Sequence, residues 1–303
     1  MTGSFVQRQL RASLTLPQGN FPGTNSNTLV LTNLRMSARV EQVGGGYNTL
    51  DLRIYGMRQA DMQAVTVVWV TNDGVQWDPS AQALITLEAS TGNGGWVGVF
   101  NGQFIEGGPD YRALPEVCLT AQARVGYSQQ LTTPSPLSYS VSVDVATLAG
   151  QLAKQMGFAF ENNGVQAKLD KPYLSGGQMD QFRELAEAAG FDYYFTPGGG
   201  PNNSLGTIVI CPPNQGRQGK TPVPVNPQSG MVGYPTLQRY GVDVTVLFNP
   251  GIEMGSPIQI SGSSLPGTDG AWFPFAAVHE LESIKPGGHW FSHLQCMNFQ
   301  VSD

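Results

Sequence analysis

The sequence predicts a mainly β protein with a small α+β insertion. The 38 glycines and 21 prolines are scattered along 303 residues, as expected for many turns between short strands. Segments rich in β-branched and aromatic residues alternate with these turns in the first and last parts of the chain. Between them lie two stretches with a helical apolar period.

The first part of the chain, residues 1–140, is predicted to form a β domain. Its strand-like segments are LTNLRMSARV, TLDLRIYGM, AVTVVWV, ALITLEAS, GWVGVFNGQFIEG and EVCLTAQARVG. The links between them contain the turn sequences GGG, NDG, TGNGG and GGPD. A spacing of roughly 8–15 residues indicates antiparallel strands in a sandwich or a barrel.

An α+β insertion is expected over residues 141–196. Its first helix has one apolar stripe, formed by Val145, Leu148, Ala149, Leu152, Ala153 and Met156. Asp144 is the expected N-cap and Gly157 the expected stop.

The second helix of the insertion is predicted within SGGQMDQFRELAEAAGF. Its apolar face contains Met179, Phe182, Leu185, Ala186 and Ala189. Ser175 and Gln178 have the spacing of a capping box, and Gly190 ends the helix.

A loop rich in proline and glycine is expected over residues 197–230, with TIVI as its one strand. Residues 231–303 then return to β sequence in GVDVTVLF, PIQISG, AWFPFAAVHELES and HWFSHLQCMNFQV. The last two segments, joined by IKPGG, are predicted to form a hairpin. Both faces of its first arm are largely apolar, so one face needs a helix, another domain or another chain to cover it.

Charge is unusually sparse. Charged residues make up 13% of the chain, where an ordinary soluble domain carries about 25%. Because interface cores are depleted of charge, we expect much of the surface to meet other protein. The net charge is −6 and no basic run occurs, which argues against tight binding along a phosphate backbone.

The cysteines indicate a reducing compartment. Cys118, Cys211 and Cys296 are three in number and widely spaced, without a CxxC pair. This usage fits a protein folded in a reducing cytoplasm. The N-terminal stretch lacks the apolar core of a signal peptide, and no run approaches the roughly 18 apolar residues of a membrane span.

The stretch HELESIKPGGHWFSHLQC contains all three histidines, so it is the candidate metal site. His289 and His293 are four residues apart, a spacing that suits a helix. On a regular strand they would lie about 13 Å apart, too far to bind one zinc ion. His279 stands on the paired arm, in a register that the sequence does not define. We expect scaffold histidines here and no metal or cofactor.

Candidate catalytic groups are sparse. Glu280 and Glu282 share a strand face, about 6–7 Å apart at the strand rise, a separation also found in glycosidases. Lys285 lies close by, however, and a solvated face is the commoner reason for such a pair. No GxSxG elbow or phosphate-binding GxxxxGK[ST] loop occurs. We therefore expect no enzyme, and keep two alternatives: a glycan-degrading enzyme that uses Glu280 or Glu282, and a carbohydrate-binding β module.

Three stretches resemble the central baseplate hub protein of contractile-tailed bacteriophages, a family related to the hub part of type VI secretion spikes. The first comprises TLDLRIYGMRQADM, VFNGQFIEGGPD and VCLTAQARVGY. The second is the helical region SVDVATLAGQLAKQMGFAFENNGVQAKLDKPYLSGGQMDQFRELAEAAGFDYYF. The third combines GVDVTVLFNPGIEMGSPIQISG with DGAWFPFAAVHELESIKPGGHWFSHLQC. Together they span roughly residues 30–300 in order.

The resemblance implies a structural virion protein with two tail-tube-like antiparallel β domains. Such hubs are homotrimers that adapt a hexameric tail tube to a trimeric spike, with a channel for DNA. The implied partners are the chain itself, the spike, the tail tube protein or tube initiator, and the baseplate wedge proteins. DNA would be present only in transit. The implied location is the phage tail baseplate, after assembly in the host cytoplasm.

The resemblance also assigns fold-defining roles to a small set of motif residues. These are Gly56, Gly102, Pro286, Gly287, Gly288 and Trp290. No lysozyme or peptidase signature accompanies them, so wall-degrading activity is not implied.

Overall fold

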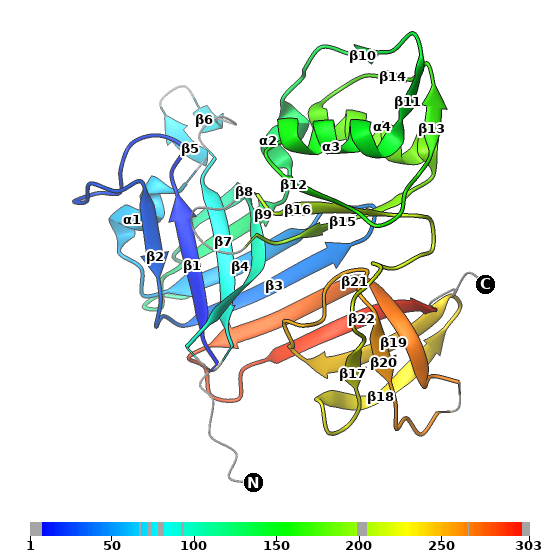
Figure 1. Cartoon of the computed structure of the whole chain (residues 1–303). Coiled ribbons are helices and arrows are strands. Elements are labelled where there is room, and N and C mark those ends of the chain that lie inside the picture. Colours follow the sequence, from blue (N-terminus) through cyan, green and yellow to red (C-terminus); the bar gives the residue numbers. More distant parts are fainter. Residues whose placement is uncertain are drawn as a thin grey trace.

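The computed structural model describes residues 8–66, 68–71, 74–77, 82–91, 94–198, 205–265 and 267–298. It confirms the predicted fold class, because strands dominate and helices gather in the middle of the sequence (Figure 1). No helix of the described ranges is long and apolar enough to cross a membrane.

The first β unit is formed by the N-terminal strands and two short helices. Its strands are β1 (Leu10–Thr15), β2 (Thr28–Leu31), β3 (Met36–Val43), β4 (Thr49–Tyr55), β5 (Val68–Thr71), β6 (Gly74–Trp77), β7 (Leu84–Ser90), β8 (Trp96–Asp110) and β9 (Cys118–Arg124). Its helices are α1 (Gln59–Ala64) and α2 (Tyr127–Leu131).

The insertion unit follows, and the second β unit completes the chain. The insertion unit contains β10 (Leu137–Ser138), β11 (Ser142–Asp144), α3 (Val145–Gln155), β12 (Ala159–Asn162), β13 (Lys168–Asp170), β14 (Tyr173–Leu174), α4 (Gln178–Ala189), β15 (Asp192–Thr196) and β16 (Thr207–Cys211). The second β unit contains β17 (Val223–Val225), β18 (Met231–Gln238), β19 (Gly241–Leu247), β20 (Ile258–Ile260), β21 (Gly270–Ser283) and β22 (Trp290–Asn298).

A single sheet of 13 strands runs through both β units. Its order is β18-β19-β22-β21-β3-β4-β9-β8-β7-β1-β2, with β20 beside β21 and β17 beside β20. The units meet where β21 pairs antiparallel with β3, from Ala276 opposite Val43 to Ser283 opposite Met36. The two β units are therefore joined edge to edge by backbone hydrogen bonds.

The two β units repeat one arrangement. Each has two hairpins, β3–β4 and β8–β9 in the first unit and β18–β19 and β21–β22 in the second. Their order in the sheet is β3-β4-β9-β8 and β18-β19-β22-β21, so the strands correspond one to one. The long strands β8 and β21 even share a register shift, between Phe104 and Glu106 and between Pro274 and Ala276.

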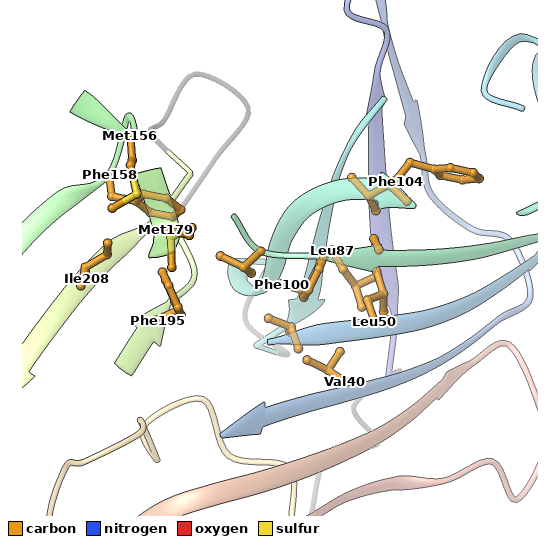
Figure 2. Close-up of a cluster of buried hydrophobic side chains, with 14 of the residues drawn as sticks. Val40, Leu50, Leu87, Phe100, Phe104, Met156, Phe158, Met179, Phe195 and Ile208 are labelled. Atoms are coloured by element: carbon orange, nitrogen blue, oxygen red, sulfur yellow. The ribbon is translucent and has the colours of Figure 1, made fainter. Parts of the chain in front are cut away.

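The insertion unit lies against both β units through a three-stranded sheet, β12-β16-β15. Tyr193 and Phe195 on β15 belong to one core with α3, α4 and the first β unit. Figure 2 shows this continuity, with Met156, Phe158 and Met179 on one side and Leu50, Leu87 and Phe100 on the other. Tyr194, on the opposite face of β15, belongs to the core of the second β unit.

Hydrogen bonds fix the insertion unit to the β3–β4 turn. The Tyr193 hydroxyl donates to the Gly45 carbonyl at 2.8 Å, and the Gly45 N–H donates to the Tyr193 carbonyl at 2.9 Å. The Asn48 side-chain amide donates to the Phe195 carbonyl at 2.9 Å. A Cβ at Gly44 would lie 2.7 Å from the Tyr194 ring, so glycine is needed for this close approach.

The N-cap predicted from the sequence is confirmed for α3 but is wrong for α4. The Asp144 carboxylate accepts from the Thr147 N–H at 2.8 Å, as predicted. The predicted capping box of Ser175 and Gln178 is wrong, because the N-cap of α4 is Gly177. There the Asp180 carboxylate accepts from the Gly177 N–H at 3.1 Å.

Candidate functional site

The hairpin of β21 and β22 is the candidate site, and its turn is held by one carboxylate. Glu282 accepts from the Lys285 ammonium at 2.8 Å and from the His289 N–H at 3.0 Å. Partial burial raises the pKa of Glu282, but these hydrogen bonds outweigh it and leave that pKa below its ordinary value. The side chain of Glu282, near the end of β21, thus holds the turn closed.

The motif residues lie at turns and close approaches. Gly56 (φ +83°) follows β4, and Gly287 (φ +67°) lies in the hairpin turn with Pro286, both in the left-handed region that favours glycine. A Cβ at Gly102 would lie 2.7 Å from the Arg124 carbonyl oxygen.

The other two motif residues belong to the end of the same turn. A Cβ at Gly288 would lie 3.0 Å from the Glu282 Cβ. Trp290 is buried, with its ring edge-on to Phe248 at a centroid distance of 5.9 Å. The fold-defining role of the whole set stays a prediction.

His279 is buried at the seam between the two β units. Its Nδ1 lies 2.8 Å from the Ser292 hydroxyl, and its Nε2 lies 3.4 Å from the Gln42 side-chain oxygen. The ring stands edge-on to Phe248 at 5.4 Å. Burial, with a smaller contribution from His293, lowers the pKa of His279 to about 4, so the imidazole is neutral at pH 7.

His289 and His293 lie on the exposed face of the same hairpin. Their ring nitrogens are 3.3 Å and 3.8 Å from one oxygen of Glu280. The expectation that these two histidines stand far apart is wrong, because His289 precedes β22 and its side chain turns back toward Glu280. His293 also contacts the Thr245 hydroxyl at 3.0 Å.

The three candidate metal ligands therefore divide between the two faces of the hairpin. His279 points into the seam, while His289 and His293 point away from it. Within the ranges that the structure describes, no group of three His, Cys, Asp or Glu residues is arranged to hold a metal ion.

Glu280 and Glu282 face the same side of β21, as predicted, and each is engaged by cations. Glu280 accepts from the Arg39 guanidinium at 2.8 Å and also faces the two exposed histidines. Glu282 is bound to Lys285. Both carboxylates thus take part in ion pairs of the sheet face.

The cysteines do not form a reactive site. Cys118, Cys211 and Cys296 are free and buried. Burial raises the pKa of all three thiols, to about 12 for Cys211, and therefore keeps them protonated.

A cavity of about 330 Å³ lies where the three units meet. Its lining includes Gln42 and His279 from the seam, and Glu161, Arg217 and Glu253 at the insertion unit's border. Arg217 is 5% exposed; it donates to both oxygens of Glu161, at 2.6 and 3.1 Å, and also binds Glu253. The pKa of Arg217 is raised, because the two carboxylates outweigh the effect of burial.

Sequence reasoning missed this ion cluster. Its members are distant in sequence, and Arg217 lies in the segment NQGRQGK, which has no motif. The only local signal is a lone arginine within a loop otherwise poor in charge.

A known family matches most of the chain. The model of the family described as "Baseplate hub gp41" matches residues 58–284. No curated protein sequence matches the chain significantly.

Solved structures share the fold at low sequence identity. A 43 kDa tail protein of prophage MuSo2 from Shewanella oneidensis has a TM-score of 0.54 at 10% identity, over 95% of this chain and 97% of that one. A tail protein from Neisseria meningitidis MC58 has a TM-score of 0.58 at 10% identity, over 95% and 96%.

A third structure comes from a secretion system. The Escherichia coli c3393 protein has a TM-score of 0.63 at 8% identity, over 95% of this chain and 77% of that one. It is described as a type VI secretion component with structural similarity to the T4 bacteriophage tail proteins gp27 and gp5.

Proposed function

The chain belongs to the baseplate hub gp41 family, and from this premise we propose that it forms the trimeric central hub of a contractile phage baseplate. The family is one of structural baseplate proteins, so the chain is a structural component of a phage tail. The hub would join the hexameric tail tube to the trimeric spike and leave a channel for DNA along its axis.

The repeated β unit is the observation that carries this proposal. Each chain contains two units of the same strand order, joined edge to edge through β21 and β3. Three copies around an axis would supply six such units, which matches a sixfold tube above and a threefold spike below. Three copies of a chain with a single β unit would supply only three units and would not match the sixfold tube.

Composition supports an assembled state. Charged residues are 13% of the chain, which suits a subunit covered by neighbours. The net charge of −6 suits a channel wall that does not retain DNA. Three buried free cysteines fit assembly in a reducing host cytoplasm before the virion is released.

The fold likeness supports a partner of the spike type. The E. coli protein of similar fold is described as structurally similar to two T4 tail proteins, gp27 and gp5. We extend this to the present chain as a proposal: the hub would bind the spike, the tube protein or tube initiator, and the baseplate wedge proteins.

The test is co-assembly with the spike protein of the same phage. We expect light scattering to give a complex of three hub chains and one spike trimer, because the proposed threefold axes coincide. A trimeric β-rich protein from an unrelated source serves as the control and should not bind. A hub that stays monomeric and ignores both spike and tube proteins would refute the proposal.

A further inference from the structure

One edge of the 13-stranded sheet is β18, an apolar strand whose outer side has no paired strand among the described residues. Among the described residues β18 pairs with β19 alone, so its other edge is bare. Tyr234 is 59% exposed and Leu237 is 52% exposed on this strand, and Tyr240 just beyond it is 69% exposed. An exposed apolar edge of this kind is a site for strand or side-chain docking.

The internal repeat identifies the kind of strand that fits there. In the first β unit the place of β18 is taken by β3, and the outer edge of β3 is covered by β21. The counterpart of β21 in the first β unit is β8. The strand that would cover β18 in the same way is therefore a copy of β8.

The corresponding part of β8 also has an edge without a paired strand. Ladder pairing with β7 ends at Gln103, and the Phe104 N–H still donates to the Ala83 carbonyl at 2.8 Å, whereas pairing with β9 continues to Asp110. Residues 105–110 thus pair with a strand on one side only, within the part of the chain that the structure describes. Tyr111, which follows them, is 42% exposed.

These two edges do not pair with each other within the described part of the chain. Six strands separate β18 from β8 in the sheet, which is about 34 Å along the sheet at a strand spacing of ~4.8 Å. We infer that β18 of one copy docks on residues 105–110 of β8 in a second copy, as β3 docks on β21 within the chain. The inference rests on the proposed function and deepens it by assigning the contact between hub subunits.

The shared register shift predicts which residues meet. The shifts make Glu106 the counterpart of Ala276, and hence Pro109 the counterpart of His279. Val40 of β3 pairs with Leu50 of β4, and Leu237 of β18 pairs with Val242 of β19. Because Leu50 and Val242 occupy matching positions in the two units, Val40 and Leu237 correspond. Since His279 pairs with Val40, Pro109 should lie opposite Leu237 of the next copy.

Prolines on both edges make the contact depend on side chains. Pro109 and Pro235 lack the N–H that a sheet ladder uses, so few backbone hydrogen bonds can form there. The apolar contact of Leu237 and Tyr111 would then supply most of the binding. The same prolines discourage indiscriminate pairing of these edges.

The experiment uses one exposed variant on each edge of the full chain. Leu237→Asp alters β18, Tyr111→Asp alters the β8 edge, and Val30→Asp, on the distant edge strand β2 and 50% exposed, is the matched control. We expect light scattering to give the trimer for wild type and Val30→Asp, and about a third of that mass for each of the other two.

Mixing the two defective variants tests the head-to-tail geometry. Each retains one intact edge, so an equimolar mixture should give a one-to-one dimer that cannot close into a ring. A cysteine pair, Pro109→Cys with Leu237→Cys, should form disulfide-linked oligomers, whereas Pro109→Cys with Val30→Cys should not. This second readout does not require either aspartate variant to fold.

The outcomes separate the two proposals. A trimer that survives Leu237→Asp and forms no disulfide in the first cysteine pair overturns the β18–β8 contact and leaves the hub function standing. A wild-type chain that stays monomeric even with its spike overturns both.

Discussion

His279 supports the seam between the β units as an uncharged side chain. It is buried at the seam between the β units and has hydrogen-bond partners on two neighbouring strands, Ser292 on β22 and Gln42 on β3. Its ring stands edge-on to Phe248, and burial, with a smaller contribution from His293, lowers its pKa. The seam therefore depends on a neutral imidazole.

This arrangement predicts a loss of stability in mild acid. The pKa of His279 is about 4 when folded, against about 6.5 when unfolded. Between these values the unfolded state binds one more proton, so the free energy of unfolding should fall by about 3 kcal/mol as the pH drops from 6.5 to 4. Urea denaturation at several pH values measures this slope.

The comparison needs two variants because carboxylates also titrate in this range. His279→Gln should flatten the slope, and His293→Gln, which changes an exposed ring of the same hairpin, should flatten it only slightly, because His293 makes the smaller contribution to the lowered pKa of His279. Equal slopes in wild type and His279→Gln would show that the seam histidine is not responsible.

Local chemistry at single residues was only partly predictable. Asp144 acts as an N-cap because the interaction spans three residues. Ser175 was the wrong N-cap, since Gly176 (φ +87°) and Gly177 follow it and bring Asp180 back to the helix start. The meeting of His289 and His293 at Glu280 depends on the turn and the strand register, which no local pattern encodes.

At the scale of elements, Arg217 joins the insertion unit to the second β unit. It binds Glu161 on β12 and Glu253 in the loop between β19 and β20. The guanidinium is buried, whereas the carboxylates are about a third to almost half exposed. Its removal would leave both carboxylates without their shared partner.

We therefore expect Arg217→Met to lower the free energy of unfolding by about 2–4 kcal/mol. The matched control is Arg112→Met, whose guanidinium is 83% exposed in its pair with Asp110, and which should cost much less because exposed ion pairs contribute little to stability. Chemical denaturation compares the two. A loss at Arg217 no larger than the loss at Arg112 would contradict the bridging role.

Elements with a clear hydrophobic period in the sequence were predictable, whereas elements that depend on tertiary contacts were not. The stripe of α3 and the hairpin of β21 and β22 were found from pattern alone. Strand β1 was missed although Leu10, Ala12 and Leu14 alternate with polar residues. The helix α1 was also missed, because its six residues are too short for a helical period to stand out.

The two apolar faces of β21 illustrate what could not be predicted from the sequence alone. The sequence indicated that both faces would be covered, but not by what. The register shift between Pro274 and Ala276 changes the alternation, so Trp272 and Ala277 both join the second core. Leu281, further along the strand, belongs to the first core. One strand thus serves both cores, which follows from pairing between distant segments.

At the scale of the whole molecule, the chain resembles two copies of one β unit built into a single sheet. The repeat was not visible as a sequence period, because it is expressed in strand order and in a shared register shift. Its consequence is that β18 and the unpaired part of β8 correspond to β3 and β21, which pair with each other inside the chain. The low content of charge, by contrast, could be read directly from the composition.

In the proposed assembly, three copies place six similar β units around one axis. Electron cryo-microscopy of the hub bound to its spike tests this most directly. We expect a threefold map in which β18 of each chain adjoins β8 of the next, and the six β units enclose an open channel. A map with one hub chain per spike, or with three chains that do not meet through their β units, would contradict it.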